Sequence, residues 1–258
     1  MRLDVYLFQR GFTKSRERAK VLVEEGNVKV NGVTVSKPSY ALDDNAEYSI
    51  EMFDDCPYVS RGGLKLERIL NDTGISVDGC TCIDIGASTG GFTHCLLLNG
   101  ARKVYAIDSG TNQLDETLKN DDRVISKEGY NARTIEIDHI GELADIITID
   151  VSFISQTLIL PNALRLLKDG GYYLSLIKPQ FEVGKSNVGK NGIVKDSNAR
   201  YIAVKKVIDG AAACLFNCCY LAKSPIKGGD GNIEYVAAFS KLEESIDECT
   251  IKRIVYEK

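Results

Sequence analysis

The spacing of apolar residues along the chain predicts two structural units. Apolar positions recur at helical spacing over residues 3–8 and again over 15–25, where Ser15 is a candidate N-cap. Gly26 is expected to end the second helix. Residues 28–35 then alternate apolar and polar side chains around an Asn-Gly pair, which predicts a hairpin with a tight turn. The first unit is therefore expected to be a small α+β module.

A linker is expected at residues 54–58. Apolar periodicity lapses there, and Pro57 disfavours a helical conformation at Cys56. We therefore expect one domain at residues 1–55 and a second at 59–245.

Short apolar runs alternate with helical patterns through the second domain. This alternation predicts an α/β fold with a doubly wound sheet. Strands are expected near residues 81–85, 103–107, 123–125, 146–149, 171–177, 215–222 and 233–239, with helices including 64–70 and 155–167. The last two strands flank the turn-rich residues 224–232, which favours an antiparallel hairpin at one edge of the sheet.

The first strand of this domain ends in a glycine-rich turn. Residues 82–92 read Cys-Ile-Asp-Ile-Gly-Ala-Ser-Thr-Gly-Gly-Phe, and such a turn lets backbone approach a nucleotide cofactor at the carboxyl end of a parallel strand. The spacing differs from the dinucleotide fingerprint G-x-G-x-x-G, and no basic residue between Asp84 and Phe92 is available to hold a pyrophosphate. These departures favour S-adenosylmethionine over a dinucleotide.

The next strand supports a nucleoside cofactor. It ends in Asp108, about 20 residues after the turn, where a carboxylate can accept both ribose hydroxyls. The alternative is a glycine turn that only packs a helix on the sheet of some other α/β protein.

Charge is distributed unevenly along the chain. The net charge is −4, yet residues 1–40 carry eight basic and four acidic side chains, a local charge of +4. A basic helix and a hairpin lysine could contact a phosphate backbone, whereas the alternative is an ordinary solvated helix face. The expected RNA-binding residues are Arg2, Lys14, Arg16, Arg18, Lys20 and Lys29.

The composition argues against several other classes of protein. No apolar run approaches the ~20 residues of a membrane helix, and the amino terminus lacks the apolar core of a signal peptide, so we expect a cytoplasmic protein without stable membrane association. The eight cysteines have no small-domain disulfide framework. No metal is expected, because there are only two histidines and no paired C-x-x-C motifs.

Four ionisable residues lie next to predicted strands or glycine turns, where ligands of open parallel sheets gather. Asp150 and Lys178 each end a strand, Lys65 follows the motif Ser-Arg-Gly-Gly-Leu, and Glu234 follows a glycine turn. Each alone could be a solvated strand end, or in the case of Asp150 a helix cap. Together they resemble the Lys-Asp-Lys-Glu tetrad of the FtsJ-like ribose 2'-O-methyltransferases.

The resemblance extends over nearly the whole chain. The first module is similar to the alpha-L RNA-binding domain of the ribosomal S-four type. This module, together with the motifs at residues 60–65, 84–93, 148–155 and 177–185, resembles the TlyA, or hemolysin A, family of ribosomal RNA methyltransferases. The resemblance implies a Rossmann-like methyltransferase domain that uses S-adenosylmethionine and acts at cytidine ribose in ribosomal RNA or ribosomal subunits.

The resemblance also implies roles for individual residues. Lys178 would take the proton of the 2'-hydroxyl, although a free lysine with a pKa near ~10.4 is mostly charged at neutral pH. Lys65 would supply a neighbouring positive charge, and Asp150 and Glu234 would position the two lysines. The cofactor residues would be Gly86, Ala87, Ser88, Gly90, Gly91 and Phe92 around its methionine and ribose, Asp108 on the ribose, Asn131 near the adenine and Asp150 facing the methyl group.

Two other function classes compete with this hypothesis. A methyltransferase acting on a small molecule or a protein explains the glycine turn but leaves the basic module unused. A noncatalytic RNA-binding protein or a membrane-active hemolysin leaves the four ionisable residues unexplained.

The chain departs from the TlyA family pattern near the residue expected at the adenine. The family usually reads closer to Glu-Arg-Thr-Asn where this chain has Lys-Glu-Gly-Tyr-Asn at residues 127–131.

Overall fold

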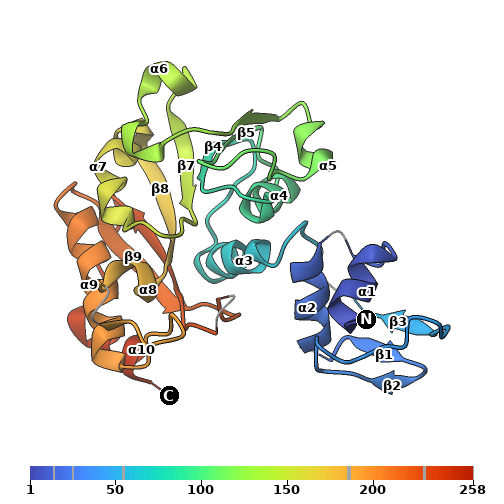
Figure 1. Ribbon diagram of the computed structural model, residues 1–258. Helices are drawn as coiled ribbons and strands as arrows, with labels where there is room; N and C mark the ends of the chain where they lie inside the picture. The colour runs from blue at the N-terminus through green and yellow to red at the C-terminus, as the bar shows by residue number, and fades with distance from the viewer. Residues whose placement is uncertain (14, 25, 54–55, 185–186, 229–230, 258) are drawn as a thin grey trace. The chain divides into compact units, whose positions relative to one another are not determined.

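The computed structural model describes residues 1–13, 15–24, 26–53, 56–184, 187–228 and 231–257 (Figure 1). The predicted RNA-binding residue Lys14 lies outside them. The chain divides into two compact units, Met1–Pro57 and Tyr58–Lys258, each with its own apolar core.

The first unit combines two helices with a three-stranded antiparallel sheet. Helices α1 (Leu3–Gln9) and α2 (Arg16–Glu24) precede strands β1 (Val28–Val30), β2 (Val33–Thr34) and β3 (Ile50–Met52). The strand order is β2-β1-β3. Apolar side chains of α1, α2 and β1 form the core.

The local predictions for this unit are confirmed. The Ser15 hydroxyl accepts a hydrogen bond from the Arg18 backbone N–H, as expected of an N-cap. Asn31 and Gly32 have φ values of 51° and 78°, which is the backbone that a tight hairpin turn needs. Strand β3 has only three residues, too few for an alternating pattern to reveal it.

The second unit is built on a seven-stranded sheet in the order β6-β5-β4-β7-β8-β10-β9. Neighbouring strands from β6 to β8 are parallel, whereas β10 is antiparallel to both β8 and β9. The predicted doubly wound sheet with an antiparallel edge hairpin is therefore confirmed. The strands are β4 (Thr81–Ile85), β5 (Lys103–Ile107), β6 (Val124–Lys127), β7 (Ala144–Ile149), β8 (Leu167–Ile177), β9 (Asn217–Lys223) and β10 (Tyr235–Ser240).

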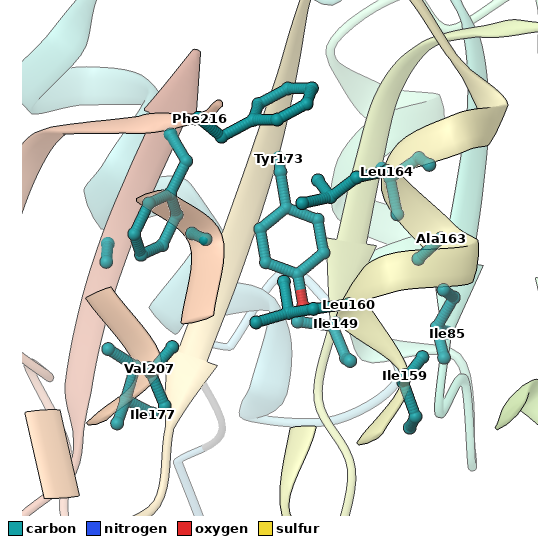
Figure 2. Packing of buried hydrophobic residues seen from close by; sticks show 14 of the residues in the cluster. Ile85, Ile149, Ile159, Leu160, Ala163, Leu164, Tyr173, Ile177, Val207 and Phe216 are labelled. Atoms are coloured by element: carbon teal, nitrogen blue, oxygen red, sulfur yellow. The ribbon is translucent and has the colours of Figure 1, made fainter. Parts of the chain in front are cut away.

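Helices cover both faces of this sheet, because successive side chains of a strand point to opposite faces. On one face α3 contacts β10 and α4 contacts β5. On the other, α7 and α9 pack around Tyr173 of β8 (Figure 2), and α10 contacts α9 and β9. The helices are α3 (Gly62–Thr73), α4 (Gly91–Leu98), α5 (Glu116–Lys119), α6 (Ile137–Ile140), α7 (Leu160–Ala163), α8 (Pro179–Glu182), α9 (Ser197–Ala212) and α10 (Glu248–Tyr256).

The continuous helix predicted over residues 155–167 is wrong. The structure has three short pieces there: a 3-10 turn at Gln156–Leu158, helix α7 and a second 3-10 turn at Leu164–Leu166. Pro161 lies in the first turn of α7, and proline has no N–H to bond the preceding turn. The short pieces leave residues 150–155 as a loop beside the carboxyl end of β7.

Candidate functional site

The glycine turn after β4 lies against the end of β7. Gly86 has a φ of 84°, and a Cβ there would lie 2.4 Å from the backbone oxygen of Asp150, so only glycine fits. A Cβ on Gly91 would lie 2.3 Å from Ser60 Oγ. A Cβ on Gly90, a predicted cofactor residue, would instead lie 2.2 Å from the Leu118 side chain, and Gly90 lines neither cleft described below.

A cleft of about 450 Å³ opens at the carboxyl ends of β4, β5 and β7, and we call it the Asp108 cleft. Its volume is in the range of small-molecule sites. The Asp108 carboxylate is held by two backbone N–H groups, which are Ser88 N at 2.7 Å and Gly110 N at 2.7 Å. Because each carboxylate oxygen has two lone pairs, Asp108 can still accept hydrogen bonds from a ligand. Asn131 also lines this cleft.

Glu128 shapes one wall of the Asp108 cleft, a role that the sequence did not reveal. Its carboxylate accepts hydrogen bonds from the backbone N–H groups of Asn112, Gln113 and Leu114 at 2.8–3.1 Å. These bonds lower the pKa of Glu128. The loop that carries Gln113 is thereby fixed at the rim of the cleft.

A second, mainly polar cleft, the Lys178 cleft, adjoins the first. The two clefts share Gly86, Ser88, Asp150 and Ser152, so they form one continuous site. The Lys178 cleft is lined by the predicted cofactor residues Ala87, Gly91 and Phe92, by the predicted catalytic residues Lys65 and Lys178, and by Ser60, Arg61, Gly62, Thr89, Ile226 and Lys227.

The four predicted catalytic residues form two ion pairs. Lys178 Nζ lies 2.5 Å from Asp150 Oδ1 and donates a hydrogen bond to Ser152 Oγ at 2.9 Å. Lys65 Nζ lies 2.7 Å from Glu234 Oε2, and Gln180 donates to the other oxygen of Glu234 at 3.3 Å. Glu234 is only 3% exposed and lies behind Lys65, outside the cleft lining. The sequence did not indicate that Ser152 and Gln180 belong to this cluster.

Phe153 is a further residue that the sequence pattern did not reveal. It lies at the rim of the Asp108 cleft, is 92% exposed and has a φ of 64°, which is uncommon for a residue with a bulky side chain. Its ring lies 5.1 Å from that of Phe181. An exposed aromatic face at the mouth of a polar site is suited to stacking on a planar group.

Asp84 has a structural role rather than a ligand-binding one. It is fully buried, and its two oxygens accept hydrogen bonds from Thr93 at 2.7 Å and Thr148 at 2.8 Å. Burial raises the pKa of Asp84 to about 6, although these hydrogen bonds act to lower it. The side chain therefore ties α4 to β7 beneath the site.

The raised pKa of Asp84 should be visible in the pH dependence of the free energy of unfolding. Because its folded pKa of about 6 lies above the ordinary 3.8, its contribution favours folding below about pH 4 and is lost as the pH rises through 6. The free energy of unfolding of the native protein relative to Asp84→Asn should fall by up to about 3 kcal/mol between pH 4 and 7.5. Urea unfolding of both proteins across this range measures the difference, and parallel curves would contradict the assignment.

Basic side chains of the first unit form ion pairs within the protein that the sequence pattern did not indicate. Arg2 and Arg16 each place Nε 2.9 Å from the buried carboxylate of Asp4. Burial opposes ionisation of Asp4, but the two arginines outweigh it and lower its pKa. Both guanidinium side chains remain about half exposed.

Among the described residues, the other predicted RNA-binding side chains also have partners. Lys20 lies 3.8 Å from Glu24, and Lys29 lies 3.3 Å from Glu51 with its amine over the Phe53 ring. Arg18 follows Ser15 in the first turn of α2. Exposed ion pairs of this kind are weak, so a phosphate can compete for the cation.

The described part of the chain shows neither a membrane-spanning helix nor a metal cluster. No helix among those residues is long and apolar enough to cross a membrane. No group of three or more histidine, cysteine, aspartate or glutamate side chains among them is arranged to hold a metal ion.

Comparison with known families matches both units. Residues 58–241 match the FtsJ-like methyltransferase family, and residues 1–47 match the S4 domain. The FtsJ-like match alone covers well over half of the chain.

Individual relatives match over most of their length. Hemolysin A of Brachyspira hyodysenteriae is 45% identical over 93% of this chain and 99% of its own. The 16S/23S rRNA (cytidine-2'-O)-methyltransferase TlyA of Mycobacterium tuberculosis is 38% identical over 91% of this chain and 87% of its own. A solved structure from Streptococcus thermophilus has a TM-score of 0.79 at 43% identity and covers 99% of this chain and 94% of the other.

Proposed function

Because the chain belongs to the FtsJ-like methyltransferase family, we propose that it transfers a methyl group from S-adenosylmethionine to a ribose 2'-hydroxyl of ribosomal RNA, at cytidine. The observation that carries this proposal is the convergence of the Lys178–Asp150 and Lys65–Glu234 ion pairs on a polar cleft that meets the Asp108 cleft at Asp150. The named relatives support the substrate, since one of them methylates cytidine ribose in 16S and 23S rRNA, as its name says.

The residues present suit S-adenosylmethionine. Asp108 at the end of β5 can hold the ribose hydroxyls, and Gly86, which lines both clefts, lets the glycine turn lie directly against the Asp150 backbone. Asp150 lines both clefts, and its buried Oδ1 has the Lys178 ammonium as its only close partner among the described residues. When bound, the cofactor supplies a positively charged sulfonium with an electrophilic methyl group, which an anionic Asp150 would favour.

The side chains of the Lys178 cleft would prepare the ribose hydroxyl. Lys178 Nζ can accept the hydroxyl proton only as a neutral amine, so its own proton must first leave to solvent through the cleft that it lines, while Asp150, with Oδ1 at 2.5 Å, keeps its negative charge and holds the amine in place. Ser152 fixes the direction of the amine through its hydroxyl. The Lys65–Glu234 pair places a second cation beside the cleft, where it can orient the hydroxyl. Orientation of the reacting groups in line contributes several kcal/mol by itself.

Features around the clefts favour RNA over a small molecule. Arg61 and Lys227 line the Lys178 cleft outside the two ion pairs, where cations can contact phosphates next to the target ribose. Phe153 offers an exposed ring for an unpaired base. The S4 domain supplies a separate surface for ribosomal RNA or a ribosomal subunit, and this substrate implies a cytoplasmic location.

Methyl transfer from labelled cofactor tests the proposal directly. The protein is incubated with isolated ribosomal subunits, with free ribosomal RNA and, for comparison, with bulk protein and small molecules. We expect label in ribosomal RNA, recovered after digestion as 2'-O-methylcytidine. Label confined to protein or small molecules, or none at all with correctly folded protein, would reject the function.

Removal of basic side chains from α2 tests the RNA-binding role of the S4 domain. The double change Arg16→Ala with Arg18→Ala should weaken binding to ribosomal RNA most at low salt. The slope of log affinity against log salt should become shallower by roughly one for each phosphate that the variant no longer binds. Because Arg16 also holds Asp4, thermal unfolding must show that the variant is folded. Lys205→Ala on α9 is the charge-loss control, and an unchanged slope in the double variant would argue against this helix as an RNA-binding element.

A further inference from the structure

Lys178 and Asp150 each lie one residue beyond the paired end of a strand. β7 is paired with β8 up to Ile149, the Asp150 N–H donates to the Ile85 carbonyl, and Ile177 of β8 is paired with Tyr235 of β10. Beyond these strand ends, Asp150 enters a loop that runs to residue 155, and Lys178 precedes the four-residue helix α8. The sheet thus fixes the backbone at Asp150 and Ile177, whereas Ser152, which accepts the hydrogen bond of Lys178, lies in the loop and needs a further connection to α8.

Glu182, the last residue of α8, makes that connection. Its side chain is only 2% exposed. One oxygen accepts a hydrogen bond from the Gln156 backbone N–H at 2.8 Å, and the other accepts one from the Ser155 hydroxyl. Lys206 of α9 completes the cluster, with Nζ 3.2 Å from Glu182 Oε2 and 3.0 Å from Ser155 Oγ.

The same cluster is anchored to β8 just before Lys178. The side-chain oxygen of Gln156 accepts hydrogen bonds from Ser175 at 2.6 Å and Tyr173 at 3.2 Å, and its amide reaches the Leu176 carbonyl at 3.4 Å. Gln156 and Ser175 are almost completely buried. Buried polar groups that are satisfied in this way hold one arrangement firmly.

None of the four residues of this cluster lines either cleft. Glu182, Ser155, Gln156 and Lys206 thus cannot contact substrate directly in this structure, and they act through the segments they join. Asp150 lies five residues before Ser155, and Lys178 lies four residues before Glu182.

We propose that Glu182, paired with Lys206, is a positioning residue that sets Lys178 against Asp150 and Ser152. This inference rests on the proposed function, because it assigns Lys178 a place in the transfer step. Loss of the charge on Glu182 should therefore slow turnover more than it weakens the cofactor site, since displacement of a reacting group by about 1 Å can cost up to a hundredfold in rate.

The test uses the conservative change Glu182→Gln in the full chain. We expect kcat for ribosomal RNA methylation to fall roughly tenfold to a hundredfold, while the KM for RNA and the affinity for S-adenosylhomocysteine change by a smaller factor, because residues 150–154 also line the Asp108 cleft. Lys206→Met should reproduce the effect. The matched control is Glu142→Gln, which also breaks ion pairs to Lys103 and Arg102 but at the opposite ends of the strands, and which should leave kcat unchanged.

A second readout does not depend on activity. Hydrogen exchange of the amides in residues 150–156 should be faster in Glu182→Gln than in the native protein and in Glu142→Gln. The native protein and Lys178→Ala are measured in the same methylation assay. An inactive native protein would reject the methyltransferase function alone, and hydrogen exchange would then still test the positioning role. Native exchange rates in Glu182→Gln, or full kcat in a folded variant, would overturn the positioning role.

Discussion

Replacement of Lys178 with alanine is expected to abolish methyl transfer while leaving cofactor affinity nearly intact. Lys178 lines the polar cleft that we propose to receive the ribose hydroxyl, and it does not line the Asp108 cleft. The change removes both the proposed proton acceptor and a group that orients the hydroxyl, so turnover should fall by a factor of roughly 10³ or more. Single-turnover transfer of a labelled methyl group measures the loss, and calorimetric titration with S-adenosylhomocysteine measures the affinity.

A second substitution at the same position separates the two parts of that role. Arginine keeps a positive charge and hydrogen-bond donors but does not lose a proton at accessible pH. Lys178→Arg should be as inactive as alanine if the amine accepts the proton, and partly active if it only orients the hydroxyl. Lys168→Ala, on the same strand but near the other end and paired with Asp145, is the control that should retain full activity. Retained turnover in Lys178→Ala would reject the assignment.

The parts of the fold that follow local rules were predictable from the sequence. The N-cap at Ser15, the Asn31-Gly32 turn and the apolar strand before Gly86 each depend on a few adjacent residues. The continuous helix predicted over 155–167 was wrong, because the prediction rested on the apolar spacing and neglected Pro161. In the structure this proline lies in the first turn of a new short helix, as expected of a residue without an N–H.

The structure brings the four predicted catalytic residues close together, but the sequence did not show how they pair. Sequence order does not show that Lys65 meets Glu234, which lies 169 positions away, or that Lys178 meets Asp150. The sequence equally gives no sign that Asp4 would bind both Arg2 and Arg16. Such contacts depend on how the strands and helices pack in three dimensions. The residues adjacent in sequence do not indicate that packing.

The buried Lys65–Glu234 pair predicts the largest change in stability. The two side chains are 10% and 3% exposed, so removal of the lysine leaves a buried carboxylate whose hydrogen-bond donor among the described residues is Gln180. Lys65→Met should lower the free energy of unfolding by about 3–5 kcal/mol, because an unpaired buried charge is costly. Urea unfolding measures this loss. The exposed pair Lys168–Asp145 is the comparison, since Lys168→Met should cost less than about 1 kcal/mol.

A compensating change at Glu234 separates the stability contributed by this pair from its part in the reaction. In the double variant Lys65→Met with Glu234→Gln this site keeps no unpaired buried charge, so most of the lost stability should return. Methyl transfer should stay low, because the cation beside the ribose hydroxyl is still missing from the cleft. If the double variant recovers both stability and turnover, Lys65 only maintains the fold. If it recovers stability alone, the cation at position 65 contributes to the transfer step itself.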